Sequence, residues 1–343
     1  MYCAVFYFLN DCENNTVIKK LPITMPMYTI YHYAASAGVV AACNQTSDIW
    51  YFNNTVNWRC IRPTPEYSRV DLCICNSSVW DIPFIKKTET SFRFIRGYVT
   101  EIIEEMLRQN CYIIFGGVDD YFIKGKQHYM QQHFGHDGLI VGFDSERKML
   151  SMVAYDERRQ YCEFETPYEG FIQGVEHECE LGEYGNLTSA EVDPDYVCTL
   201  DPAGIKTRLT EYMSGHTEEG YFPGIPIEVD YGILVYGAVV EYVEMFLHGE
   251  LPPECLDQRI FKCIYEHKKC MSRRIATLDA FLGTDTALGE GYDEVERLAG
   301  IVRMSALKAE LSPEKRVFIG IAEKLRHLSE LENDILSRVI REL

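Results

Sequence analysis

The sequence is poor in positive charge. It has 33 lysine and arginine residues against 52 aspartate and glutamate residues, which gives a formal net charge of −19 at pH 7. Nucleic acids and anionic membrane surfaces both attract basic proteins, because both carry negatively charged phosphates. The charge therefore argues against a nucleic-acid partner and against a membrane partner. The simplest interpretation of the excess of acids is solubility.

Paired cysteine motifs are missing as well. The chain has 13 cysteines, but no two of them are separated by two residues, and Cys73 and Cys75 have no second pair to complete a metal site. Zinc ribbons and thioredoxin-like redox sites need such pairs, and a disulfide framework is typical of much shorter secreted chains. The cysteines are therefore expected to be free thiols in a reducing compartment, and we predict a cytoplasmic protein.

Neither a transmembrane helix nor a secretion signal is expected. The longest late apolar run, from Tyr231 to Leu247, is interrupted by Glu241 and Glu244 and is too short to span a bilayer. Residues 2–9 are apolar, but they have no basic lead and no small-residue cleavage site after them. This first segment is predicted to be a strand.

What the sequence does contain is enough apolar material for two domains. Hydrophobic residues make up 47% of its 343 residues, which excludes a disordered chain. The sequence predicts an α+β domain over residues 1–175, an acidic connecting region over 176–229 and a helical domain over 230–343. Apolar runs predict strands at 2–9, 27–32, 49–52, 70–75, 111–118, 138–143, 149–155 and 160–164. Helices are predicted at 34–43, 98–107, 167–173, 203–214, 230–247, 256–282, 291–310 and 313–342.

His136 is the strongest candidate for a catalytic residue. It lies directly before the apolar run Gly138–Phe143, and a polar turn separates this run from a second one that ends at Asp156. In an antiparallel hairpin, positions 136 and 156 would lie at the same open end. An aspartate there can accept a hydrogen bond from one ring nitrogen of His136 and leave the other nitrogen to act as a base. The alternative is a structural histidine beside a turn aspartate.

The nucleophile of such a site is harder to assign. A reactive thiolate is favoured at the N-terminus of a buried helix, where the helix dipole stabilises negative charge. The helix predicted at 34–43 is of this kind, but it is preceded by His32-Tyr33 and has its cysteine, Cys43, at the opposite end. Ser36, one turn inside the helix, is the candidate nucleophile that remains.

Two further groups of polar residues have weaker patterns. His128, His133 and His136 fall within nine residues, but their spacing is not that of a helix face, and no carboxylate or cysteine lies at a familiar ligand offset. Neither a metal ion nor another cofactor is therefore predicted. Asp119 and Asp120 follow an apolar run and are expected to form a turn, with a role at the rim of a site as the alternative.

Part of this pattern is similar to a known family. The stretch from Cys111 to Ile172 resembles the N-terminal domain of the butirosin biosynthesis protein H family. The matching pieces are Val118-Asp119-Asp120-Tyr121-Phe122, His136, Gly142-Phe143-Asp144, Asp156 and Thr166-Pro167-Tyr168-Glu169-Gly170-Phe171-Ile172. The helical half is similar too, at Tyr231-Gly232, Val235-Tyr236, Arg259, Glu266-His267-Lys268, Arg274-Ile275 and Leu307-Lys308. The resemblance covers most of the chain after about residue 98.

The resemblance implies a fold and a chemistry. It implies a papain-like α+β domain with an antiparallel sheet, followed by a C-terminal helical domain. It also implies acyl transfer from a carrier-protein thioester to an amine, with His136 as the base and Asp156 as the residue that orients it. The family's nucleophilic cysteine has no match here, because the helix that should open with it is preceded by Tyr33. Ser36 or a cysteine from elsewhere would have to replace it.

Three functions are compatible with the sequence. The first is acyl transfer in specialised-metabolite biosynthesis, with an acyl or peptidyl carrier protein and a small-molecule amine as partners. The second is a catalytically degenerate accessory protein that binds a nonribosomal-peptide assembly system. The third is a hydrolase that uses Ser36 or a displaced cysteine. The sequence does not predict the acyl group or the oligomeric state.

Overall fold

The computed structural model describes residues 17–30, 34–63, 72–216, 229–283 and 288–343, and they fall into two compact units. The sheet unit comprises Met1–Thr24, Val39–Cys43 and Pro83–Pro194. The helical unit comprises Met25–Gly38, Asn44–Ile82 and Asp195–Leu343. Helix α1 (Ala34–Ala41) supplies residues to both units. None of the described helices is long and apolar enough to cross a membrane.

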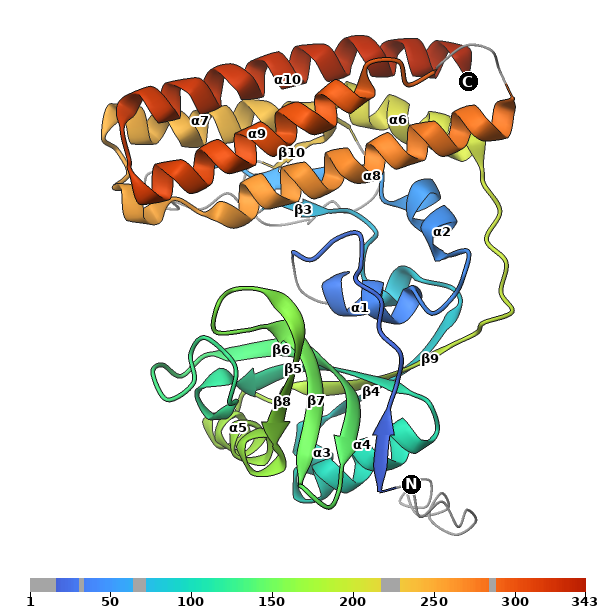
Figure 1. Cartoon of the computed structure of the whole chain (residues 1–343), viewed down its shortest axis with the longest axis vertical. Helices are drawn as coiled ribbons and strands as arrows, with labels where there is room; N and C mark the ends of the chain where they lie inside the picture. The colour runs from blue at the N-terminus through green and yellow to red at the C-terminus, as the bar shows by residue number, and fades with distance from the viewer. Residues whose placement is uncertain (1–16, 31–33, 64–71, 217–228, 284–287) are drawn as a thin grey trace. The chain divides into compact units, whose positions relative to one another are not determined.

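The sheet unit is built on one seven-stranded sheet in which every pair of neighbouring strands is antiparallel (Figure 1). The strand order is β4-β9-β5-β6-β7-β8, and β1 pairs with β6. Strand bounds are β1 Ile18–Lys20, β4 Ile85–Ser91, β5 Tyr112–Asp119, β6 Gly135–Asp144, β7 Met149–Tyr155, β8 Tyr161–Pro167 and β9 Asn186–Val192.

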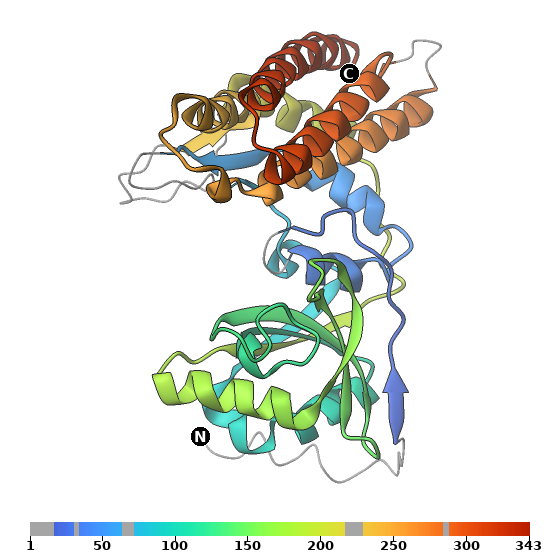
Figure 2. The same ribbon diagram turned by 60° about the vertical axis from the view of Figure 1, so that its left-hand side comes forward.

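Three helices pack on this sheet, namely α3 (Phe92–Ile95), α4 (Val99–Arg108) and α5 (Tyr168–Leu181). Figure 2 shows α5 lying across one face of the sheet. Its Phe171 is fully buried and meets Phe115 of β5 edge to face, with ring centroids 5.3 Å apart. Burial of these two rings contributes to the hydrophobic stabilisation of this layer.

The helical unit consists of long helices and a small sheet. Helix α10 packs along both α7 and α9, and α9 also packs along α8 (Figure 1). The bounds are α2 Ser47–Asn54, α6 Pro202–Ser214, α7 Val235–His248, α8 Gln258–Leu282, α9 Tyr292–Leu311 and α10 Lys315–Glu342. The small antiparallel sheet has the order β10-β2-β3, with bounds β2 Trp58–Ile61, β3 Leu72–Ile74 and β10 Val229–Tyr231.

The mixed α and β composition, the antiparallel sheets and the C-terminal helices confirm the coarse fold prediction. The strands predicted at 111–118, 138–143 and 149–155 correspond to β5, β6 and β7. The strand predicted at 49–52 is wrong, because these residues lie inside helix α2. Its aromatic residues favour strands in isolation, but Trp50, Tyr51 and Phe52 are buried on a helix here, so tertiary packing outweighs propensity. Residues 27–30 form no strand, and the strand predicted at 2–9 lies outside the described residues.

The units are divided differently from the predicted domains. The predicted boundary at residue 175 falls inside helix α5, and the acidic region 176–229 contains β9, which lies between β4 and β5 in the sheet. A strand of this kind needs only alternate apolar side chains, because the two neighbouring strands supply its backbone hydrogen bonds. Much of the early chain, Asn44–Ile82, belongs to the helical unit.

Candidate functional site

Several buried polar side chains of the sheet unit lie near the end of strand β5. A β-bulge between Phe115 and Val118 shifts the pairing of β5 with β6, so that Val118 lies opposite His136. Gly117 has a φ of 68°, and a Cβ atom there would lie 2.8 Å from the Cα atom of Gly185. Gly117 and Gly185 therefore permit the bulge and the close approach of the two chain segments, as glycine does elsewhere.

The side chain of His136 faces a buried ion pair. Asp120 and Lys126 are both nearly inaccessible, and the Lys126 ammonium lies 3.2 Å from Oδ1 of Asp120. The Nδ1 atom of His136 lies 3.4 Å from Oδ2 of Asp120 and 3.2 Å from Nζ of Lys126. Its Nε2 atom lies 3.5 Å from Oδ1 of Asp137, and about a third of the side chain, 34%, is exposed.

This geometry allows two tautomers of His136 with opposite chemistry. With the proton on Nδ1, this proton lies on the side of Asp120, whose Oδ2 is 3.4 Å away, and Nε2 can accept a proton. With the proton on Nε2, the ring donates toward Asp137, and Nδ1 accepts a hydrogen bond from Lys126. Lys126 can remain bound in either case, because it also donates to the carbonyl oxygen of Asp137 at 3.1 Å. Only the first tautomer provides a base that points away from the ion pair.

The predicted partner Asp156 has a different role. The hairpin of β6 and β7 forms as predicted, but Oδ1 of Asp156 accepts the backbone N–H groups of Arg158 and Gln160, both at 2.8 Å. Its other oxygen, Oδ2, accepts a hydrogen bond from the thiol of Cys162 at 3.6 Å. The carboxylate thus shapes the turn that follows β7. Among the described residues, the carboxylates that contact His136 are those of Asp120 and Asp137.

Ser36 is not brought together with His136 in one unit. It is buried in helix α1 and belongs to the helical unit, whereas His136 and Asp156 belong to the sheet unit. His32 and Tyr33, which precede this helix, lie outside the described residues.

Seven of the eleven described thiols are poor candidates for a nucleophile. Cys43, for example, is half-buried at the end of helix α1, where it pairs with the hydroxyl of Tyr112 at 2.8 Å. Burial raises its pKa, whereas a catalytic thiol needs a lowered pKa. Burial likewise is the main cause of the raised pKa of Cys60, Cys111, Cys162, Cys179, Cys198 and Cys263.

A second polar cluster lies at the same strand end. The Asp119 side chain is fully buried, and its Oδ2 lies 2.6 Å from Nδ1 of His133 and 2.8 Å from Nδ1 of His177. Burial opposes ionisation of Asp119. Hydrogen bonds from His133 and from the backbone N–H groups of Phe134 and Tyr121 outweigh it and lower the pKa of Asp119. The carboxylate is therefore held in its charged form.

These contacts were only partly visible in the sequence. The three histidines considered together do not form one site, because His136 faces Asp120, His133 faces Asp119 and His128 packs near Phe134. His177 was missed, since it lies on α5 and far from the other two in the sequence. The sequence feature that could have indicated these contacts was the pair Asp119-Asp120 at a strand end. Asp120 contacts His136, whereas Asp119 contacts the other two histidines.

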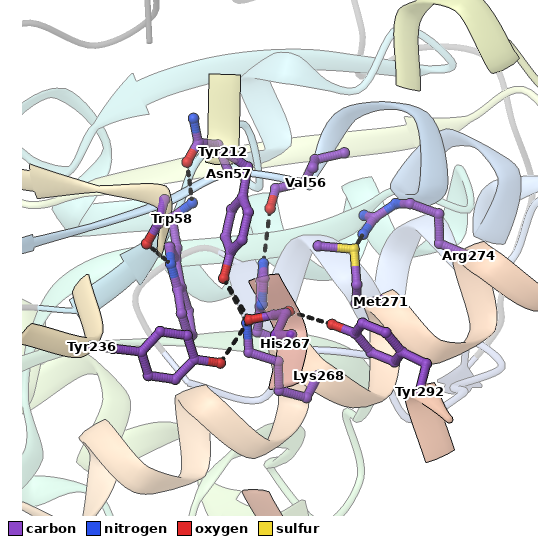
Figure 3. A network of polar contacts seen from close by, with 12 residues as sticks. Val56, Asn57, Trp58, Tyr212, Tyr236, His267, Lys268, Met271, Arg274 and Tyr292 are labelled. Atoms are coloured by element: carbon purple, nitrogen blue, oxygen red, sulfur yellow. Dashed lines mark hydrogen bonds and ion pairs between the residues drawn. The ribbon is translucent and has the colours of Figure 1, made fainter. Parts of the chain in front are cut away.

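The helical unit contains a third polar cluster, which Figure 3 shows and whose side chains are buried. Lys268 and Glu332 form an ion pair, and neither side chain is exposed. The hydroxyls of three tyrosines also donate to the Glu332 carboxylate, and they belong to Tyr212, Tyr236 and Tyr292. Burial lowers the pKa of Lys268 to about 8, although Glu332 opposes this shift. A saturated cluster without access for a substrate is a packing element, so we assign it to the core.

No protein-family model matches the chain, and a search of curated proteins found no match either.

Proposed function

We propose that the chain catalyses acyl transfer from a carrier-protein thioester to a small-molecule amine, with His136 as the general base. The observation that carries the proposal is the position of this ring. One face of His136 is backed by the buried carboxylate of Asp120, while a third of the side chain is open to solvent. A base needs an unprotonated ring nitrogen with access to its substrate, and the Nδ1–H tautomer of His136 provides one.

The reaction follows from this arrangement. The amine nitrogen attacks the thioester carbonyl carbon, and Nε2 of His136 takes the proton that the nitrogen loses. The C–S bond then breaks, and the imidazolium returns this proton to the leaving thiolate of the carrier. Asp120 stabilises the imidazolium, and Lys126 compensates the Asp120 charge while the ring is neutral. Direct aminolysis of this kind needs no covalent nucleophile, in agreement with the raised thiol pKa values.

Further support comes from the resemblance to the butirosin biosynthesis protein H family. A papain-like fold for the sheet unit is part of the proposal, and the hairpin that carries His136 supports it. In this chain we assign the orienting role to Asp120, because Asp156 is bound within its own turn. Free thiols among the described cysteines support a reducing, cytoplasmic setting.

The test uses an acyl carrier protein loaded with a thioester and a panel of amines, and follows the carrier by intact mass. His136→Gln is expected to slow loss of the acyl group in the presence of amine by about 10²–10⁴-fold, the usual contribution of a general base. His128→Gln is the matched control, since His128 packs near Phe134 in the loop before β6. Equal rates for wild type and His136→Gln would refute the proposal.

One observation favours a second function, that of a non-catalytic accessory protein. Nζ of Lys126 lies within hydrogen-bond distance of Nδ1, and this contact favours the tautomer whose Nε2 carries the proton. An accessory protein would bind the carrier protein without turnover, and His136→Gln would leave that binding unchanged. Nitrogen NMR of the His136 ring distinguishes the two functions, because only the catalytic form has an unprotonated Nε2.

A further inference from the structure

Asp119, His133 and His177 converge from three elements of the sheet unit. Asp119 is the last residue of β5, His133 lies in the loop before β6, and His177 lies on helix α5. Each residue offers one ligand atom, and these atoms all lie within 4.8 Å of one another. We propose that the three residues form a binding site for a divalent first-row transition-metal ion such as zinc. The proposal does not rest on the chemistry of His136.

The carboxylate of Asp119 is fixed in the orientation that such a site needs. Its Oδ1 accepts the backbone N–H groups of Tyr121 at 3.0 Å and of Phe134 at 2.9 Å. Oδ2 is left to face the two imidazoles. Metal ligands are commonly oriented by outer hydrogen bonds of this kind, which keep the free oxygen aimed at the ion.

His177 is not satisfied by the contacts it makes. Its Nδ1 atom lies 2.8 Å from Oδ2 of Asp119, yet the alignment does not make a hydrogen bond, and this nitrogen is buried without any other partner in the described structure. The well-aligned donor to Oδ2 is His133. A buried ring nitrogen without a partner is costly, and a cation between the two rings and the carboxylate would bind it.

Aromatic packing holds the two rings in position. The rings of His133 and His177 stack at 4.4 Å with an angle of 15° between their planes, and Tyr121 stacks on the other side of His133 at 4.3 Å. Phe122 contacts both histidines. This packing brings the two imidazoles together, and the rings would have to tilt out of the stack for one ion to lie in the plane of each.

The oxygen and nitrogen ligand atoms lie slightly closer together than a bound ion would hold them. In a tetrahedral site with metal–ligand distances of about 2.0–2.1 Å, neighbouring ligand atoms lie roughly 3.3 Å apart. The two nitrogen–oxygen distances here are 2.6 and 2.8 Å, so they would open by about 0.7 and 0.5 Å. The His133 side chain is 54% exposed, which leaves an entry path and room for a water ligand.

Local charge also favours a cation. The carboxylate of Glu178 is buried next to this cluster, where it approaches Gly135. A divalent ion would reduce the repulsion between the carboxylates of Glu178 and Asp119. Two imidazoles and one carboxylate suit zinc, iron, cobalt or nickel, whereas magnesium and calcium prefer oxygen ligands alone.

The test is a titration of the chelator-treated full-length protein with Co²⁺, followed by its visible absorption, and with Zn²⁺ by calorimetry. We expect one site, with spectra typical of nitrogen and oxygen ligands. His133→Ala and His177→Ala are each expected to weaken binding by at least about 10–100-fold. His128→Ala, which removes a histidine from the same loop, should bind like the wild type.

Three results would overturn the site. They are no Co²⁺ binding by the wild type at micromolar concentrations, unchanged affinity in His133→Ala, and thiolate charge-transfer bands that place the ion on cysteines. Circular dichroism and thermal unfolding establish that each variant is folded. Where His177→Ala fails to fold, His133→Ala decides alone, because the more exposed His133 is less important for packing.

Discussion

Lys268 places its ammonium nitrogen 2.9 Å from Oε1 and 2.8 Å from Oε2 of Glu332, in a region that solvent does not reach. The loss of hydration of the two charges offsets most of their Coulomb attraction, so the intact pair contributes little net stability. Removing one partner is nevertheless strongly destabilising, because the other charge stays buried. The pair joins α8 to α10, and Trp58 from the small sheet lies 3.9 Å from the lysine nitrogen.

Lys268→Met is therefore expected to lower the free energy of unfolding by about 3–5 kcal/mol, because Glu332 is left buried without its cation. Urea denaturation measures the change. The double variant Lys268→Met/Glu332→Leu should be more stable than the single one, since no charge remains buried. Arg297→Ala, which breaks an exposed pair with Glu294, is the control and should unfold like the wild type. A single variant as stable as the double one would contradict this explanation.

Above about pH 10, ionisation of tyrosines in the unfolded chain should destabilise the same region. Between about pH 8 and 10 the lowered pKa of Lys268 acts in the opposite sense. Burial, and then the charge of Glu332, raise the pKa of Tyr212, Tyr236 and Tyr292 well above the ordinary value. As the pH rises through about 10, the unfolded chain loses these protons while the folded chain keeps them. The unfolded state then binds fewer protons, so the free energy of unfolding falls with pH, by at most about 1.4 kcal/mol per pH unit for each tyrosine.

Denaturation curves between pH 8 and pH 11 measure this slope. Tyr292→Phe removes one of the titrating groups, so its stability should depend less steeply on pH above about 10 than that of the wild type. Parallel slopes for the two proteins would show that Tyr292 ionises alike in the folded and unfolded chains.

Asp120 and Asp156 are alternative candidates for the carboxylate that orients His136. The structure favours Asp120, and the sequence pattern favoured Asp156. Asp120→Asn removes the carboxylate that faces Nδ1 of His136 and is expected to reduce acyl transfer by about 10²–10⁴-fold. Asp156→Asn changes a residue that is bound in the turn after β7, and turnover should remain close to that of the wild type. Both rates are measured with the loaded carrier protein, at a temperature where thermal unfolding shows each variant to be folded. The opposite order of the two rates would restore Asp156 as the orienting residue.

The thiols should react slowly near neutral pH. Seven described cysteines have raised pKa values, mainly because they are buried, and thiolate is the reactive form. Alkylation followed by peptide mapping should find Cys255, the exposed cysteine among those described, modified first. Cys255→Ser should then remove the fastest phase, and urea should make all thiols react alike. Rapid labelling at pH 6 of any of the seven would instead identify an activated nucleophile.

Gly117 should resist substitution. Its φ of 68° and its approach to Gly185 leave no room for a side chain, so Gly117→Ala is expected to cost about 1–3 kcal/mol of stability. Because the bulge sets the direction of Asp119 and Asp120, the variant should also weaken both polar clusters. Gly97→Ala is the matched control, since a Cβ atom there would meet nothing within 4 Å. Equal unfolding curves for the two variants would argue against this role of the bulge.

The sequence predicted the parts of the fold that depend on local pattern. The hairpin of β6 and β7 was visible from two apolar runs and a polar turn, and α10 was visible from its periodic stripe. Glu332, which interrupts that stripe, gave no hint of its partner, because Lys268 and the tyrosines reach it from distant parts of the chain. Strand β9 was missed for a similar reason, since the pairing with β4 and β5 places it in the sheet in spite of its acidic composition.

For the candidate site, the sequence predicted the position of His136 but not its contacts. His136 lies at the mouth of β6, as its sequence position indicated. Its carboxylate partner could not be read from spacing, because the bulge in β5 decides that Asp120 faces the ring. His133 and His177 meet only because α5 packs on β5, and a pattern along the chain does not contain that contact.

The ion pair of the helical unit can form only late in the synthesis of the chain. Lys268 leaves the ribosome before Glu332, so until α10 emerges the nascent chain has a lysine at a core position without its counter-ion. A product that stops after Leu311 would lack the carboxylate on which Lys268 and three tyrosines converge. Proteases that recognise loosened chains would therefore degrade interrupted products faster than finished ones, and pulse proteolysis of the two lengths measures the difference.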